Sequence, residues 1–212
     1  NEAGYRDARL VKDSIYHVKP GRLGIDLTFD QGKKYYFRNV TWTGNSVYSA
    51  DALNSILQIG KGDVYDVVTM EHRLQGGGKQ GDMDVTKAYR DNGYLFFSVT
   101  PVETNIQNDS VDVEFRVTEG KQATFNNIII NGNDLTNEKV VRRQVFTRPG
   151  YLFTQSDFER SIREIASLGQ FDPEAIADPA TGWSLIPNPN DNTVAIVYNV
   201  TEKPSSQLAL SG

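Results

Sequence analysis

The sequence predicts an α+β protein of tandem repeats, each a three-stranded mixed sheet covered on one face by two helices. The main observation is a strand-like stretch that occurs three times, at residues 23–29, 111–117 and 194–200. Each copy alternates apolar with polar side chains, which is typical of a strand with one buried face. Between copies the elements read strand, helix, helix, strand, strand, in about 85 residues per repeat. That order predicts a two-layer domain.

The glycines and turns of the chain recur at the same spacing as these strands. Gly32 and Gly120 follow the first and second copies, and the turn at residues 42–45 reappears 88 positions later at residues 130–133. Residues 62–65 match residues 150–153 at the same offset. Self-similarity at a fixed offset indicates an array of similar domains.

The repeats divide the chain into four predicted parts. Residues 1–32 form the C-terminal hairpin of an upstream repeat, residues 33–120 and 121–203 form two complete repeats, and residues 204–212 form a linker and the start of a further strand. A lone hairpin is marginally stable in water. We therefore expect the natural protein to continue upstream and to supply the helices that cover this hairpin.

The first complete repeat is predicted to contain two helices, the second of them interrupted. Ser49 can cap the first helix, which has an apolar stripe at helical spacing. The glycine-rich stretch 76–81 interrupts the second helix. The expected elements are a strand at residues 35–42, helices at 50–58 and 67–90, and strands at 96–106 and 111–117.

The second complete repeat follows the same order with a longer final connection. We expect Thr136 to cap a helix that reaches Phe146 and Thr154 to cap a helix that reaches Leu168. Residues 171–192 contain four prolines and should hold a short edge strand, at residues 173–177, and a long loop.

Composition excludes several classes of function. The formal net charge of −5 gives no electrostatic footprint for nucleic acid. No apolar run approaches the roughly 20 residues of a membrane-spanning helix. The sequence opens at Asn1 in the middle of a repeat pattern, without a basic, apolar leader, so we expect any signal peptide to lie outside this sequence. The absence of cysteine fits a reducing compartment or a periplasmic protein without disulfides.

The sequence contains no recognisable catalytic, metal-binding or cofactor-binding pattern. His17 and His72 are the only histidines, and neither has a partner at metal-ligand spacing. The stretch 76–81 lacks the Lys-Ser or Lys-Thr ending of a phosphate loop. Asp82 and Asp84 lack the rest of a calcium loop, and they suit the start of a helix better. We predict a protein that is not an enzyme and that has no metal or cofactor.

Three segments resemble POTRA domains: residues 89–94 at the end of a helix, residues 117–120, and residues 125–133. The tail at residues 207–212 is similar to the first barrel strand of BamA-type outer-membrane protein assembly factors. The resemblance implies a location at the periplasmic face of the outer membrane. It implies unfolded outer-membrane proteins, accessory outer-membrane lipoproteins and the protein's own C-terminal membrane barrel as partners.

Two other interpretations remain open at this stage. The same domains occur in two-partner secretion and translocation–assembly transporters, which have a dedicated client. An adhesion array or the accessory domain of an enzyme belongs to a different class altogether.

The candidate binding site consists of the backbone groups of an edge strand rather than of side chains. Pro101 cannot donate to a ladder, which predicts that its strand lies at a sheet edge. Such an edge can bind an extended client by strand augmentation, or it can be merely solvated or covered by a neighbour. The predicted client-binding edge is Phe97, Ser98, Val99, Thr100, Val102, Glu103 and Thr104, and a second candidate edge is Arg9, Val11, Asp13 and Ile15. Glu119, Gly120 and Lys121 are predicted to form the hinge between the complete repeats.

Overall fold

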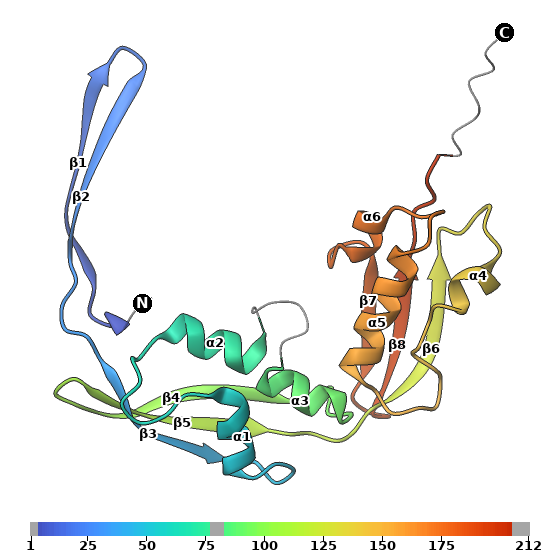
Figure 1. The fold of residues 1–212 in the computed structure, drawn as a ribbon, viewed down its shortest axis with the longest axis horizontal. Coiled ribbons are helices and arrows are strands. Elements are labelled where there is room, and N and C mark those ends of the chain that lie inside the picture. The colour runs from blue at the N-terminus through green and yellow to red at the C-terminus, as the bar shows by residue number, and fades with distance from the viewer. Residues whose placement is uncertain (1–3, 77–82, 205–212) are drawn as a thin grey trace. The chain divides into compact units, whose positions relative to one another are not determined.

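The computed structural model describes residues 4–76 and 83–204 and contains two compact units (Figure 1). The first unit combines Asn1–Lys87 with Ser98–Glu119, and the second combines Ala88–Phe97 with Gly120–Gly212. Each unit holds one three-stranded sheet with helices on one face. The predicted fold class is therefore confirmed.

The sheet of the first unit has its last strand in the middle. β5 (Ser110–Thr118) pairs in parallel with β3 (Tyr36–Thr43) and antiparallel with β4 (Ser98–Gln107). The apolar side chains of β5 that alternate in the sequence are all buried, as expected for a central strand with one covered face. The helices of this region are α1 (Ala50–Leu57), α2 (Val67–Gln75) and α3 (Val85–Asp91).

The first two helices begin at capping side chains. The Ser49 hydroxyl accepts a hydrogen bond from the N–H of Ala52, as the sequence predicts. Asp66 caps α2 by accepting from the N–H groups of Val68 and Thr69. α2 ends at Gly76, and the rest of the glycine-rich stretch 76–81 lies outside the described residues.

The sheet of the second unit repeats this topology. β8 (Thr193–Asn199) lies between β6 (Thr124–Asn131), with which it is parallel, and β7 (Trp183–Asn188), with which it is antiparallel. The core-facing side chains of β8 are buried against α5 (Gln155–Ala166) and the helices around it. Thr154 caps α5 as predicted.

Two predictions for this unit are wrong. The helix expected from Thr136 to Phe146 is the single-turn α4 (Glu138–Arg142), because the Asn137 side chain provides the cap. Residues 173–177 are not a strand but helix α6 (Pro173–Ala177). Proline has no N–H and suits the first turn of a helix, where that donor would have no partner. β7 takes the place of the predicted edge strand.

Residues 88–97 belong to the second unit by their contacts, although the sequence repeat places them in the first. The carbonyl of Gly93 accepts from the N–H of Ala123 at 2.8 Å. The Asp91 carboxylate accepts from the N–H and the hydroxyl of Ser156, at 2.7 and 2.8 Å, in the first turn of α5. Leu95 lies in the apolar core of the second unit.

Gly44 and Gly132 permit the same close approach in the two units. Each follows the first strand of its sheet and has a positive φ of 84°. A Cβ atom on Gly44 would lie 2.2 Å from the carbonyl oxygen of Val117, and one on Gly132 would lie 2.0 Å from that of Val200. Only glycine fits these turns.

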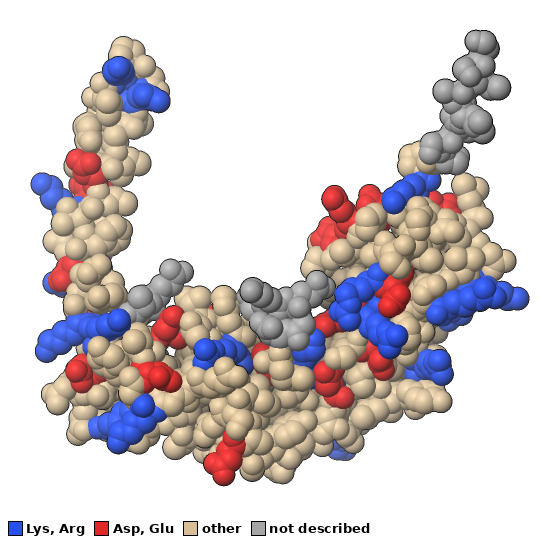
Figure 2. All heavy atoms as spheres, viewed as in Figure 1, with Lys and Arg blue, Asp and Glu red and all other residues tan. Residues whose placement is uncertain are grey.

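β1 (Arg9–Lys19) and β2 (Arg22–Asp30) form an antiparallel hairpin with a two-residue turn. One face of the hairpin is apolar and exposed, and Figure 2 shows that most of its visible surface carries no charge. The apolar residues that share this face are Leu10, Ile15, Leu23, Ile25, Leu27 and Phe29. No described helix covers them, as the sequence led us to expect.

A glutamate at the end of each central strand fixes the turn that follows the first strand. Glu119 accepts from the N–H groups of Ser46 and Val47. Glu202 accepts from the N–H groups of Leu135 and Thr136, at 3.1 and 2.6 Å. Carboxylates that accept backbone hydrogen bonds make stronger bonds than neutral acceptors do.

The Glu202 contact makes stability depend on pH. Partial desolvation favours a higher pKa for Glu202, but the hydrogen bonds from Thr136 and Leu135 outweigh it and hold the pKa below its ordinary value. Because the folded-state pKa is depressed, the stabilisation is complete above the unfolded-state pKa of about 4.3 and is lost as the pH falls through the folded-state pKa.

We predict that Glu202→Gln lowers the midpoint temperature of the second unit by a few degrees at neutral pH and flattens its pH dependence below about 4.3. The amide still offers one acceptor but carries no charge. Thermal unfolding followed by circular dichroism across pH measures both effects. Glu71→Gln, at an exposed position in α2, is the control; an equal loss in both variants would contradict the assignment.

Candidate functional site

β4 is an edge strand. In the described residues it pairs with β5 alone, and its other side has no partner strand. It extends over ten residues, Ser98–Gln107, and its outer half projects as a hairpin with β5. A long edge of this kind presents unpaired N–H and C=O groups.

Pro101 decides which backbone groups of β4 point away from the sheet. It lies opposite Phe115 in the ladder but has no N–H to donate. Residues of an antiparallel strand alternate between positions that bond the partner strand and positions that point away from it. Val99 therefore points its N–H and C=O outward, and Ile106 does so after the register shift within the strand.

The predicted edge residues occupy different positions in the structure. Thr100 and Val102 have the parity that bonds β5, so their N–H groups are occupied. Val99 has outward backbone groups, but its side chain is buried. Phe97 precedes β4, and its buried ring stacks on Tyr89 with centroids 4.0 Å apart, so it belongs to the core. Ser98 is also in β4, and Glu103 and Thr104 lie at its register shift.

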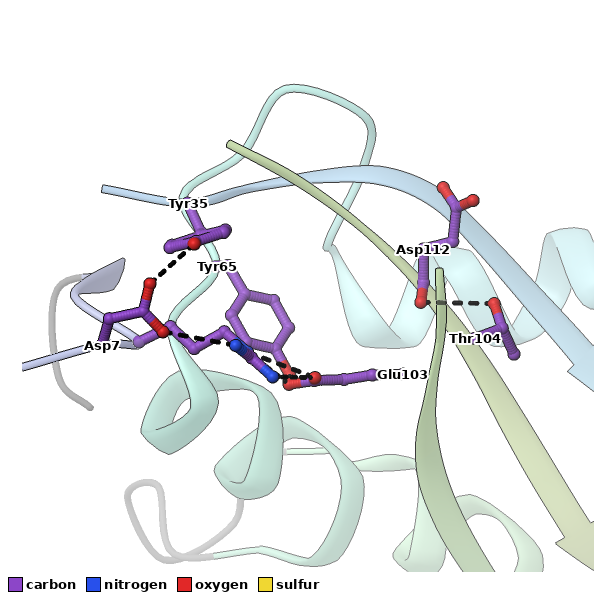
Figure 3. Close-up of polar contacts among 7 residues, drawn as sticks. Asp7, Tyr35, Tyr65, Glu103, Thr104 and Asp112 are labelled. Atoms are coloured by element: carbon purple, nitrogen blue, oxygen red, sulfur yellow. Dashed lines mark hydrogen bonds and ion pairs between the residues drawn. The ribbon is translucent and has the colours of Figure 1, made fainter. Parts of the chain in front are cut away.

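The side chain of Glu103 is already engaged. Its carboxylate accepts from the Arg6 guanidinium at 2.8 Å and from the Tyr65 hydroxyl at 2.7 Å (Figure 3). The hydrogen bond from Arg6, with that from Tyr65, outweighs desolvation and lowers the pKa of Glu103. Burial, together with the bond to Glu103, raises the pKa of Tyr65. Glu103 thus ties β4 to other segments of its unit and is not free to bind a client side chain.

Asp7 completes this cluster. Its carboxylate accepts from the Tyr35 hydroxyl at 2.7 Å and from Arg6 at 3.3 Å (Figure 3). The carbonyl of Gly4 accepts from the N–H of Tyr35 at 2.9 Å. Arg6 and Glu103 are 97 positions apart, so no local pattern in the sequence could have joined them.

The second candidate edge lies in β1. Arg9, Val11, Asp13 and Ile15 are all exposed, and β1 pairs with β2 alone among the described residues. The corresponding edge of the second unit is β7, which has six residues and includes Pro187. β7 therefore offers fewer outward N–H groups than β4 does.

The described residues show no grouping of three or more histidine, cysteine or carboxylate side chains that could hold a metal ion.

The second unit contains buried hydroxyl groups that are bonded to each other or to the backbone. The Tyr198 hydroxyl lies 3.1 Å from the hydroxyl of Thr147, which is buried, and Ser161 donates to the carbonyl of Asp157. No described helix is long and apolar enough to cross a membrane.

A family model described as POTRA, surface antigen variable number repeat, matches residues 35–120 and 123–203. This chain belongs to the POTRA family. The two matches correspond to the two sheets with their helices.

The curated relatives are longer than this chain. A putative outer membrane protein assembly factor from Treponema pallidum is 25% identical over 98% of this chain and 24% of its own length. The outer membrane protein assembly factor BamA of Neisseria meningitidis is 25% identical over 90% of the chain and 24% of its own length. The chain thus spans about a quarter of the curated relatives it matches.

Solved structures share the fold. The structure of Haemophilus influenzae BamA POTRA3-5 aligns with 95% of this chain and 75% of its own, with a TM-score of 0.74 and 17% identity. BamA from Haemophilus ducreyi lacking POTRA domains 1-3 aligns with 80% of this chain and 30% of its own, with a TM-score of 0.58 and 18% identity. The POTRA arrangement of strands and helices is therefore common to all three.

The boundary between the two units passes through the predicted hinge. Glu119 is the last residue of the first unit and Gly120, with a φ of 71°, begins the next part of the second. The chain also crosses between the units after Lys87 and after Phe97. Bending at Glu119, Gly120 and Lys121 stays a prediction.

We predict that hydrogen exchange distinguishes the two sides of β4. The amides of Val99 and Ile106 point away from β5 and should exchange faster than those of Thr100 and Val102. The difference should be roughly tenfold or more, since each 1.4 kcal/mol or so of opening free energy changes the rate tenfold. Amide exchange resolved by NMR measures it, and equal protection of all four would show that both sides of β4 are paired.

Proposed function

We propose that this chain is part of the periplasmic arm of an outer-membrane protein assembly factor, and that β4 receives an extended segment of an unfolded outer-membrane protein. The names of the curated relatives support the assembly role. The open edge of β4 is the observation that carries the binding mode. Such binding makes no covalent bond and needs no cofactor.

The chemistry of the edge suits many different clients. Val99 and Ile106 offer outward N–H groups, and Pro101 offers an outward carbonyl without a donor beside it. A strand that pairs with these groups gains main-chain hydrogen bonds that any sequence can make. Side-chain demands are small, because Glu103 is occupied by Arg6 and Tyr65.

The other partners belong to the same proposal. Accessory outer-membrane lipoproteins would dock on the POTRA surfaces, and a C-terminal membrane barrel would follow residues 204–212, of which all but the first lie outside the described residues. Helices of a further POTRA repeat would cover the apolar face of the β1–β2 hairpin. The exposed Ile15, Ile25 and Phe29 support this last point, since a patch of this kind seldom remains open to water.

We predict that an unfolded outer-membrane protein segment slows the amide exchange of Val99 and Ile106 and leaves that of Thr100 and Val102 unchanged. The added strand pairs with the outward groups only. The measurement is NMR exchange on the 212-residue chain with a synthetic peptide from a transmembrane strand of an outer-membrane protein.

The matched control is the same peptide methylated on alternate backbone nitrogens, which removes its donors without changing its side chains. That peptide should bind at least about tenfold more weakly, corresponding to about 1.4 kcal/mol. Equal binding of both peptides, or protection confined to other strands, would contradict augmentation at β4.

A further inference from the structure

The other edge of the first sheet is open over half of its length. The first half of β3 is paired with residues 62–65: the N–H of Phe37 donates to the carbonyl of Asp63, and the N–H of Gly62 donates to the carbonyl of Phe37. Beyond the register shift after Phe37, no described strand lies beside β3 on this side.

The second unit shows which backbone groups point into this space. Ile128 lies 88 positions after Val40, and its carbonyl accepts from the guanidinium of Arg142 at 3.3 Å on the side away from β8. Asn131, of the opposite parity, accepts from the N–H of Val200 on the β8 side. Val40 and Trp42 face the core like Ile128 and Ile130, so their N–H and C=O groups point to the open edge.

The two units differ in the residue that covers this edge. Arg142 in α4 covers the edge carbonyl of the second unit. At the equivalent position, 88 residues earlier, the first unit has Asn54 in α1. Its short side chain accepts from the indole N–H of Trp42 at 2.8 Å instead. The edge of β3 is therefore left without the arginine that occupies the edge of β6.

A groove of about 580 Å³ lies at this place. It runs along β3 at Val40, between α1 at Asn54 and the turn at Gly60 and Lys61. Thr104 and Asp112, which Figure 3 shows linked by a hydrogen bond from the threonine hydroxyl, border its other end.

The charges around the groove favour an acidic ligand. Its charged lining residues are Arg38, Lys61 and Asp112, two cations against one anion. Arg38 donates to Asp112 at 2.7 Å, and this bond lowers the pKa of the carboxyl, so the two charges are paired. The exposed Lys61 remains as the cation of the groove that can meet a carboxylate.

We propose that this groove is a second strand-binding site, which takes an extended, acid-bearing segment of a partner protein against the open half of β3. Main-chain hydrogen bonds to Val40 and Trp42 hold the segment, and Lys61 pairs with its acidic side chain. The open half of β3 lies on the opposite edge of the sheet from β4, and Thr104 of β4 only borders the far end of the groove. The outward N–H groups of Val99 and Ile106 take no part in this site.

We predict that Asn54→Arg closes the site by supplying the arginine that the second unit has. The probe is a labelled, end-capped peptide Thr-Val-Asp-Val-Thr, added to the 212-residue chain, with binding measured by fluorescence anisotropy. Asn54→Arg should weaken binding at least about tenfold. Asn54→Ala loses the same bond to Trp42 but leaves the groove empty, so it should bind within about twofold of the original chain.

The charge contact is tested separately. Lys61→Gln should weaken binding of the aspartate peptide and leave unchanged that of the same peptide with asparagine in place of aspartate. Bound peptide should slow the amide exchange of Val40 and Trp42.

Equal effects of Asn54→Arg and Asn54→Ala, or no binding at all, would overturn the proposal. Protection of Val99 and Ile106 alone would also overturn it while leaving augmentation at β4 intact. Slower amide exchange at Val40 and Trp42, with no change at Val99 and Ile106, would support the site at β3 and contradict augmentation at β4. Thermal unfolding of each variant checks that the fold is retained.

Discussion

The sheet of each complete POTRA repeat has three strands, so two strands in each of these sheets are edges whose outward backbone groups need a partner. Burial of the alternating side chains of β5 and β8 holds the sheets together, but it leaves the main-chain groups of the flanking strands unsatisfied. The structure meets this demand differently at each edge. In our proposals, these differences decide which strand edge of a POTRA repeat binds an extended segment of another protein.

The first half of each opening strand is treated alike in both units. Residues 62–65 pair with β3, and residues 150–153 pair with β6 through equivalent backbone bonds. The other edge strands, β4 and β7, each contain a proline. Pro101 and Pro187 lie opposite a core residue of the central strand, and each removes one outward N–H donor. Proline at an edge discourages indiscriminate pairing. β4 nevertheless retains outward donors on both sides of Pro101, because it is long, whereas β7 is short.

Much of this architecture could be read from the sequence because its causes are local. The period of two in residues 111–117, the caps at Ser49 and Thr154 and the lone proline of β4 each act within a few residues. The two wrong predictions for the second unit also have local causes. Asn137 caps α4 in place of Thr136, and the proline of residues 173–177 serves a helix start rather than an edge strand.

The candidate site was less accessible to the same reasoning. Val99 shares the parity of Pro101, but the parity of Ile106 depends on a register shift that only the paired strands reveal. The occupation of Glu103 depends on Arg6, which lies in a distant segment and has no periodic relation to it. Phe97 is next to β4 in the sequence and is predicted to belong to its edge, but its ring is buried in the core, where it stacks on Tyr89. Long-range contacts of this type carry no signal in a single sequence.

The two repeats share one fold but differ in the residue at one helix position beside the first strand. Because the offset of 88 residues holds from the first strand through the first helix, Asn54 and Arg142 occupy the same place on the same fold, and one unit serves as a control for the other. The arginine stem and guanidinium cover an edge carbonyl in the second unit, while the asparagine of the first unit turns to Trp42 and leaves a groove. A duplicated fold thus keeps its core constraints in both copies, and a single helix position decides whether a strand edge is closed by its own unit or stays available to a partner.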